Sequence, residues 1–480
     1  MIPENFGTII RKIKSNIFII QNELGQTITL EQIGKNNLVS IASKGKILIS
    51  FKDKWIEENK FVRTINNKKY YFINNEEAVI VNLLKTKFIN KLKPSKDLIN
   101  KIITLDIETY IENGDLTPYL ISFFDGIQCY NFWIEDYKNI EDMVLDCFSS
   151  IFIKKYNNYK IYMHNMGKFD IIFLLKYLVK LWKLEPIIHN GRIISIKVNS
   201  GKYNFELKDS YLILLSSLDK LCNSFNVETI KSIFPHLFIK RSNLDYTGKV
   251  PDINYFIKIS KTTYNNYINL FKNNWNLKNE AIKYCNIDCV SLFQILIKFN
   301  KLIFNLFSKN VHHYPTLPSL AFAIFRTKFI ENNLIPQLYG EIAENIRKGY
   351  TGGSVDMYIP QSKKNKKIYC YDVNSLYPFQ MNNQLMPVGT PSYFKGDIRL
   401  INPNAFGFFH CKIIAPENIE HPILQKHVNT GKGIRTIAPI GNWEDIIFSP
   451  EMDNARKFGY KFEILWGYTF EKKKLFLKNM

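Results

Sequence analysis

Between residues 101 and 308 the chain alternates short β-type segments with longer segments of helical period, and this order constrains the fold more than any other feature. The expected strands are short apolar runs at 102–107, 119–124, 127–133, 160–163, 193–198 and 203–207. The expected helices repeat apolar residues at a period near 3.6, at 140–152, 170–182 and 277–307. Asp125-Gly126 is a strong hairpin turn signal. Mixed strands with helices packed on them predict an α/β domain at 101–308.

Two further regions flank this domain. Residues 1–100 alternate short apolar runs with turn residues and predict a small β-rich domain, with a linker at 91–96. Residues 309–480 begin with two expected helices, at 318–330 and 339–346, and continue as a β-rich region with scattered Gly and Pro. Three domains agree with a length of 480 residues.

Composition supports a folded protein with a sizeable core. Hydrophobic residues make up 46% of the chain and charged residues only 22%, which argues against a disordered chain. The net charge of +21 suits a phosphate-backbone partner, although the excess of Lys, Asn and Ile also fits the coding bias of an AT-rich genome. No apolar run approaches the ~18 residues of a membrane span, so we expect no membrane partner.

Two carboxylates lie close together in the first expected strand of the α/β domain. Asp106 and Glu108 point to the same face, because side chains alternate along a strand. Like charges on one face repel unless cations separate them, and this arrangement is typical of a two-metal phosphodiester site. An edge strand with solvated acids is the simpler alternative, but the neighbouring Ile102, Ile103, Leu105 and Ile107 make it less favourable.

Two other acidic positions come later in the same domain. Asp170 opens the helix expected at 170–182, and on this segment alone a helix N-cap is the favoured interpretation. Tyr284 and Asp288 share a face of the helix expected at 277–307 because they are one turn apart. Asp288 is either exposed or, if buried, requires a partner such as a metal. Cys285 and Cys289, on the same helix, lack a second pair at zinc spacing and are interpreted as core residues.

The most specific segment is 372–378, Asp-Val-Asn-Ser-Leu-Tyr-Pro, which follows an aromatic-rich run at 368–371 that predicts a strand. A carboxylate at the end of a strand, followed by a turn, can hold a metal ion beside a nucleotide. The alternative is an ordinary turn aspartate, but the length of the pattern argues against it.

Taken together, these segments resemble the motifs of family B DNA polymerases. Residues 372–378 are similar to polymerase motif A in its DxxSLYP form, and the three upstream segments are similar to the exonuclease motifs DxE, Nx2–3(F/Y)D and Yx3D. The protein-primed members, found in phages and linear mitochondrial plasmids, are the most similar group. The resemblance implies an RNase H-like 3′–5′ exonuclease followed by an incomplete polymerase palm at 309–480.

The resemblance also implies roles for individual residues. Asp106, Glu108, Asp170 and Asp288 would hold two Mg²⁺ ions, with Mn²⁺ as the alternative, and Tyr284 would orient the attacking water. Asp372 would bind the metals of the polymerase site, Ser375 and Leu376 would line the triphosphate site, and Tyr377 would exclude ribonucleotides. DNA contacts are implied for Thr109, Asn165, Phe169, Ser217, Leu218, Tyr350, Gly352 and Gly353.

Two positions of the family pattern are less certain in this sequence: one has two candidate residues, and the other has a different residue type. Ser217-Leu218 fits the family's (S/T)Lx2h single-strand contact, but Ser210 is a competing serine. The family's Kx2h lysine is replaced by Arg241, next to Lys240, and these two side chains are not interchangeable.

The later polymerase motifs, YxDTD and Kx3NSxYG, do not occur after Tyr377. We therefore expect a fragment, a split gene product or a decayed copy, whose partners are DNA, deoxynucleoside triphosphates, a terminal priming protein and a complementing C-terminal polymerase chain. The alternatives are a stand-alone exonuclease and a DNA-binding remnant. Kinship with plasmid polymerases and the Lys/Asn/Ile excess favour a mitochondrial location.

Overall fold

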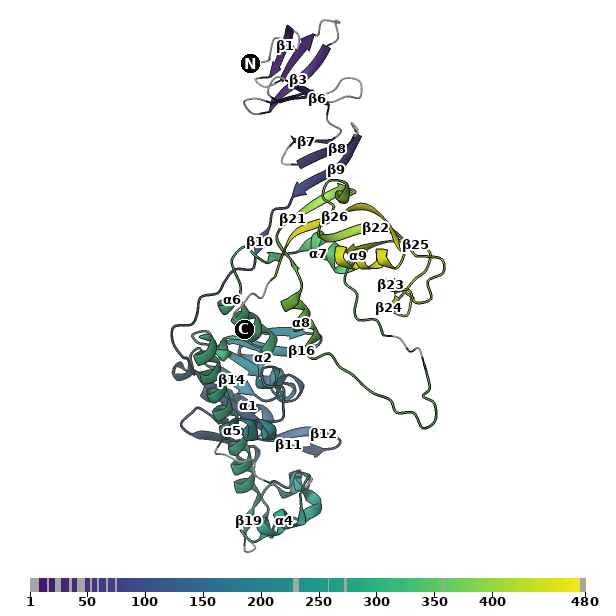
Figure 1. Cartoon of the computed structure of the whole chain (residues 1–480). Helices are drawn as coiled ribbons and strands as arrows, with labels where there is room; N and C mark the ends of the chain where they lie inside the picture. The colour runs from purple at the N-terminus through teal and green to yellow at the C-terminus, as the bar shows by residue number, and fades with distance from the viewer. Residues whose placement is uncertain are drawn as a thin grey trace. The chain divides into compact units, whose positions relative to one another are not determined.

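The structure is a computed structural model of the whole chain. It describes residues 8–474, except 15–16, 22–26, 34–36, 41–47, 52–53, 58–59, 66–67, 74–75, 228–232, 258, 272–273, 356 and 358. Before residue 78, side chains are described only at 64 and 68–71. The chain contains two compact units: residues 91–330 form one, and residues 1–90 together with 331–480 form the other (Figure 1).

The unit at 91–330 is built on a seven-stranded mixed sheet of order β13-β12-β11-β14-β17-β16-β15. Its strands are β11 (Ile102–Glu112), β12 (Asp115–Phe124), β13 (Cys129–Trp133), β14 (Lys160–Met163), β15 (Lys183–His189), β16 (Arg192–Asn199) and β17 (Asn204–Asp209). The central strands β11, β14 and β17 run parallel, and all other neighbours are antiparallel. Parallel neighbours need a crossover: α1 (Ile140–Ile151) lies in the connection from β11 to β14, and α2 (Asp170–Leu181) lies in the connection from β14 to β17.

The helices of this unit are α1 (Ile140–Ile151), α2 (Asp170–Leu181), α3 (Leu218–Phe225), α4 (Lys261–Ile268), α5 (Leu277–Phe307) and α6 (Leu317–Lys328). Of these, α1, α2 and α5 contact strands of the sheet, and α3 and α6 contact α5. The long helix α5 lies along β11 and β12, and its buried positions recur at helical spacing (Figure 1). The expected α/β domain is confirmed, although α6 extends it beyond residue 308.

The turn at Asp125 fixes the register between β12 and β13. The Asp125 carboxylate accepts hydrogen bonds from the Ile127 and Gln128 amides, both at 2.9 Å, and from Lys155 Nζ at 2.7 Å and Tyr156 OH at 2.8 Å. This turn was expected from the sequence. Because β12 pairs with β11, the same turn helps to hold the strand that carries Asp106 and Glu108.

The other unit contains a seven-stranded antiparallel sheet of order β25-β22-β26-β21-β9-β8-β7. Its strands are β7 (Lys60–Ile65), β8 (Lys68–Ile73), β9 (Glu76–Leu83), β21 (Met386–Gly396), β22 (Gly407–Ile414), β25 (Asn442–Phe448) and β26 (Lys461–Lys473). α9 (Ser449–Lys457) packs on this sheet, and Met452, Phe394 and Phe409 form part of their shared core. The unit also includes α7 (Gly340–Lys348), α8 (Leu376–Asn383), the hairpin β23 (Lys426–Asn429)–β24 (Ile434–Ile437) and the short pair β10 (Lys87–Phe88)–β20 (Pro336–Gln337). A six-stranded sheet consists of β1 (Thr8–Lys14), β2 (Ile17–Gln21), β3 (Thr27–Ile33), β4 (Asn37–Ser40), β5 (Leu48–Phe51) and β6 (Lys54–Glu57).

This sheet groups the chain differently from the three domains expected at 1–100, 101–308 and 309–480. β9 pairs with β21, so residues 76–83 belong to the same sheet as strands more than 300 residues later. Pairing between strands so far apart leaves no local sequence pattern. The boundary expected at residue 100 was therefore placed without knowledge of the pairing between β9 and β21. Among the described residues, none of the helices combines the length and the apolarity needed to cross a bilayer.

Candidate functional site

Asp106 and Glu108 project from the same face of β11, as expected from their spacing. Glu108 is only 8% exposed and Asp106 is half-buried, so this is not a solvated edge strand. β11 lies between β12 and β14 in the sheet, and its register with β12 shifts between Glu108 and Thr109. Such a bulge re-aims side chains next to it, and bulges are frequent beside active sites.

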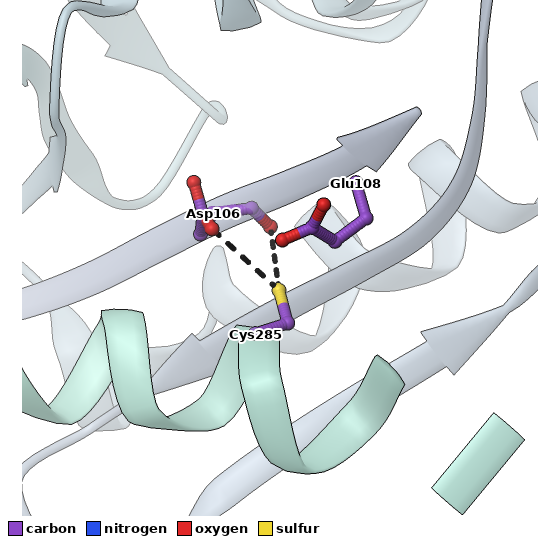
Figure 2. A group of neighbouring side chains, drawn as sticks. All are labelled: Asp106, Glu108 and Cys285. Atoms are coloured by element: carbon purple, nitrogen blue, oxygen red, sulfur yellow. Dashed lines mark hydrogen bonds between the residues drawn. The ribbon is translucent and has the colours of Figure 1, made fainter. Parts of the chain in front are cut away.

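Cys285 of α5 lies against this pair of acids. One ligand atom from each of Asp106, Glu108 and Cys285 lies within 4.8 Å of the other two. Figure 2 shows the thiol pointing from the helix toward the strand, where it donates to the Asp106 backbone carbonyl at 3.7 Å and to Asp106 Oδ2 at 3.8 Å. Burial is the main cause that raises the pKa of Cys285, so the thiol is neutral and acts as a donor. The interpretation of Cys285 as an ordinary core residue was therefore incomplete.

Asp170 belongs to the same site. It is the first residue of α2 and is 1% exposed, and its Oδ1 has no hydrogen-bond partner. Burial raises its pKa well above the usual range, and the charge of Asp106 raises it further. The N-cap position is Phe169, without any side-chain cap. The N-cap interpretation of Asp170 is therefore wrong, because the carboxylate faces other acids instead of capping the helix.

Tyr284 and Asp288 complete the group from α5. Both side chains are buried, so the alternative of an exposed Asp288 is excluded. Burial raises the pKa of Tyr284, and the charges of Asp288, Glu108 and Asp106 raise it further. The three upstream segments therefore act on one another electrostatically, since Asp106 also raises the pKa of Asp170.

Two aromatic residues that the sequence analysis did not identify hold the Tyr284 ring. Phe234 stacks on it with ring centroids 5.3 Å apart, and His236 meets it edge-on at 5.1 Å. Phe234 and His236 lie almost 50 residues before Tyr284, so only a motif that spans this distance could have identified them.

The loop at 164–169 is anchored by a fully buried aspartate, Asp209. Its carboxylate accepts from the Asn165 amide at 2.9 Å and the Gly167 amide at 3.1 Å, and Arg192 Nη2 donates to it at 2.6 Å. Asn165 has a left-handed backbone with φ of 70°, and its side-chain oxygen accepts from Arg192. At Gly167 a Cβ would lie 2.4 Å from the Ile193 carbonyl oxygen, so only glycine fits. Asp209 and Arg192 were also missed, because neither belongs to a recognisable motif.

The expected single-strand contacts differ in exposure. Thr109 and Phe169 are half-buried, and Phe169 packs edge-on against Phe173 at 5.2 Å. Ser217 is exposed and caps α3, with Leu218 half-buried beside it. The competing Ser210 is fully buried and donates to the Met163 carbonyl. Ser217 is therefore the serine that a DNA strand can reach.

Arg241, which replaces the lysine of the family's Kx2h motif, forms an ion pair within this chain. Its guanidinium forms an ion pair with Glu135 at 2.9 Å, and both side chains are largely exposed. Lys240 is exposed and lies immediately before a short 3-10 turn. Either cation is accessible to a phosphate, so the structure leaves the choice between them open.

The segment that contains motif A does not have the expected structure. Residues 368–371 form no strand, and Tyr371 is 89% exposed. A strand needs a hydrogen-bonded neighbour, and no strand within the described residues pairs with this segment. Asp372 is exposed, Ser375 has a left-handed backbone with φ of 51°, and Leu376 and Tyr377 begin α8. The Tyr377 side chain is 70% exposed.

The glycine segment before motif A is similarly open. Tyr350 is exposed, and its carbonyl accepts a hydrogen bond from His427 Nε2 at 3.2 Å. Nothing lies within 4 Å of a Cβ built at Gly352 or Gly353, so both backbones are accessible to a ligand.

Asp106 and Glu108 bring carboxylate oxygens together, and Asp170 lies close enough to Asp106 for their charges to interact. Carboxylate oxygens are the ligands preferred by Mg²⁺ and Mn²⁺. Without a cation, the buried acids repel one another, and Asp170 Oδ1 is an acceptor without a donor. A cation between them would remove both costs, because it attracts the charges and occupies the free lone pair.

Known proteins with similar sequences and folds indicate the family of this chain. The family described as DNA polymerase type B, organellar and viral, matches residues 151–479. A "Probable DNA polymerase" from Neurospora intermedia is 37% identical over 92% of this chain and 50% of its own length. Another from Ascobolus immersus is 34% identical over 95% of this chain and 39% of its own length. The chain thus spans half or less of these two relatives.

The solved structure of Phi29 DNA polymerase, complexed with primer-template DNA and incoming nucleotides, has the same fold. The TM-score is 0.51 at 19% identity, covering 78% of this chain and 61% of that one. It supports the expected α/β fold class. Since the family match covers more than half of the chain, this protein belongs to the type B DNA polymerases of the organellar and viral group.

Proposed function

We propose that this chain supplies the 3′–5′ proofreading exonuclease and the first palm segment of a protein-primed DNA polymerase. The observation that carries the proposal is the acid pair Asp106 and Glu108, whose charges reach Asp170 and, together with Asp288, Tyr284. The substrate of the exonuclease is the 3′ end of a single DNA strand. Family membership supports DNA and deoxynucleoside triphosphates as the ligands of the complete polymerase.

The four carboxylates hold two Mg²⁺ ions in this proposal, and Mn²⁺ is an acceptable substitute. When bound, the ions neutralise the scissile phosphate and lower the pKa of the attacking water. Tyr284 keeps its proton, because burial and the neighbouring acids raise the pKa of its phenol. A neutral phenol can hydrogen-bond to the attacking water but cannot act as a base at neutral pH. The role of Tyr284 is therefore to orient that water.

The 3′ end is held by residues around this site. Phe169 offers a partly exposed ring on which a base can stack, and Thr109, Asn165, Ser217 and Leu218 offer further contacts. The bond between the Asn165 amide and Asp209 fixes the loop in advance, so less conformational entropy is lost when DNA binds.

Polymerisation requires a further chain segment in this proposal. Asp372, Ser375, Leu376 and Tyr377 contribute half of a nucleotide site, and Tyr350, Gly352 and Gly353 contact the template. A complementing C-terminal polymerase chain supplies the neighbouring palm strands, and a terminal protein supplies the primer. A mitochondrial location is part of the same proposal, and kinship with organellar polymerases and the Lys/Asn/Ile excess support it.

The test is Mg²⁺-dependent release of nucleotides from a labelled 3′ single strand. Asp106→Asn should lower the rate on the order of 10³-fold, since losing a metal ligand costs several kcal/mol and each 1.36 kcal/mol is tenfold. Asp146→Asn, at an exposed acid on α1, is the matched control and should retain the wild-type rate.

Binding of the 3′ strand, measured by fluorescence anisotropy, should survive in Asp106→Asn and would exclude misfolding as the cause. Hydrolysis that persists in Asp106→Asn would overturn the exonuclease assignment. Primer extension by this chain alone would overturn the requirement for a complementing chain.

A further inference from the structure

A thiol lies inside the carboxylate site, where a site for Mg²⁺ would need only oxygen ligands. The Cys285 side chain is fully buried, and its sulfur lies within 4.8 Å of a carboxylate oxygen of both Asp106 and Glu108 (Figure 2). Its sulfur is 3.8 Å from Asp106 Oδ2, the same carboxylate that is proposed to bind a metal. The Cys285 sulfur therefore lies among the carboxylate oxygens that are proposed to bind metal.

The next cysteine on the same helix shows that this placement is specific. Cys289 is one turn later and equally buried, but its thiol donates to the Ser122 backbone carbonyl at 3.3 Å. It is not part of the group formed by Asp106, Glu108 and Cys285. α5 therefore carries one cysteine directed into the site and one directed into the core beside it.

A separate observation indicates that the site awaits a ligand. Asp170 Oδ1 is buried and has no hydrogen-bond partner. Asp170 lies close enough to Asp106 for their charges to interact. A buried carboxylate oxygen without a donor, close to the charge of another acid, is stabilised when a cation binds to it.

We propose that Cys285 gives the exonuclease site a sulfur ligand, so that the site binds thiophilic divalent cations such as Zn²⁺ and Cd²⁺ through Asp106, Glu108 and Cys285. Soft thiolate ligands select these cations, whereas carboxylates alone favour Mg²⁺ and Mn²⁺. The inference rests on the proposed function, in which these carboxylates hold metals. When the metal–sulfur bond forms, the thiol proton is released to solvent and no atom is oxidised or reduced.

The consequence is a site with two classes of metal. Mg²⁺ bound by the carboxylates supports hydrolysis, and a Zn²⁺ ion held also by sulfur competes for the same acids. Zn²⁺ should therefore inhibit this exonuclease at low concentrations. At the same concentrations, Zn²⁺ would not displace Mg²⁺ from a site that has the carboxylates but no cysteine.

The experiment is a titration of the full-length chain with Cd²⁺, monitored by the ultraviolet charge-transfer absorption of sulfur–cadmium bonds. Cys370 is exposed, so every protein carries Cys370→Ser to remove that accessible thiol. The starting protein should show the absorption with one Cd²⁺ per chain. Cys285→Ser should lose it and bind Cd²⁺ at least about tenfold more weakly, because serine offers only a hard oxygen. Cys289→Ser, the matched control, should behave like the starting protein.

A second readout separates this inference from the proposed function. Mn²⁺ binding, measured by electron paramagnetic resonance, requires the carboxylates and should be retained in Cys285→Ser. Mn²⁺ binding without a sulfur–cadmium absorption in the starting protein would overturn the thiol ligand and leave the exonuclease site intact. An absorption that persists in Cys285→Ser would also overturn it. Failure of the starting protein to bind either cation would overturn the proposed function itself.

Discussion

Replacing Asp125 by asparagine removes the charge from the turn that joins β12 to β13. Burial raises the pKa of this carboxyl group, but hydrogen bonds from Lys155, the Gln128 amide, Tyr156 and the Ile127 amide outweigh burial and lower the pKa from 3.8 to about 2. At 1.36 kcal/mol per unit, the ionised side chain contributes about 2.5 kcal/mol to the free energy of unfolding at neutral pH. Asparagine is uncharged, so it pairs neither with the lysine nor as a charged acceptor with the other donors, and Asp125→Asn should lose about this amount.

The sign of the pH dependence follows from the lowered pKa. A carboxyl with a depressed folded-state pKa stabilises the protein above its unfolded value, and this contribution is lost as the pH falls toward 2. At about pH 3 the wild-type contribution should be about 1.3 kcal/mol, so the difference between wild type and Asp125→Asn should roughly halve.

Hydrogen exchange measured by mass spectrometry on peptides from β12 and β13 tests this prediction within the full chain. An opening free energy smaller by about 2.5 kcal/mol corresponds to exchange about 70-fold faster at neutral pH. Asp146→Asn, at an exposed acid whose partner is the Tyr137 hydroxyl, is the control and should change the opening free energy by less than about 1 kcal/mol. A variant that matches wild type at neutral pH, or a difference that stays constant down to pH 3, would refute the reasoning.

Two further substitutions test the loop that carries Asn165. Gly167→Ala should lower the free energy of unfolding of the 91–330 unit by about 1–3 kcal/mol, because the new Cβ would lie 2.4 Å from a backbone oxygen. The control is Gly353→Ala, where nothing lies within 4 Å of the new Cβ, and it should have almost no effect in the same thermal unfolding experiment. Arg192→Met should cost about 3–5 kcal/mol in a urea titration, since it leaves the fully buried Asp209 without its ion pair. Arg399→Met, which breaks a pair with the largely exposed Asp453, should cost less than Arg192→Met, and equal losses would contradict the importance of burial.

Local patterns predicted most of the 91–330 unit. The helix at 277–307 and the turn at Asp125-Gly126 are determined by neighbours in sequence, through apolar period and turn chemistry, and both were predicted correctly. Pairing between distant strands was not predictable in this way. β9 and β21 meet only in the folded chain, and nothing in residues 76–83 distinguishes a strand of that sheet from one of a separate domain.

In the candidate site, too, some residues could be predicted from the sequence, whereas others are identified only by their contacts in the fold. Resemblance to a family indicated Asp106, Asp170 and Asp288, but it could not indicate Cys285 or His236, whose roles depend on what they touch. Asp170 was interpreted as a cap because helix starts favour aspartate, and only its burial beside Asp106 shows otherwise. The strand at 368–371 was expected from its residues alone, but a strand also requires a partner.

The contrast between the two sites has a physical consequence. The residues proposed for the exonuclease lie on β11, α2 and α5 within one compact unit, and their burial creates charge repulsion that the packing of that unit must offset. Such a site is preorganised, so it needs only its cations and a DNA end. The motif A segment instead exposes Tyr371 and Tyr377 to solvent, and it has no pairing partner among the described strands. Exposed aromatic residues gain free energy when a neighbouring sheet covers them. Hydrolysis should therefore be a property of the 91–330 unit alone, whereas nucleotide binding at Asp372 depends on strands that bury this segment.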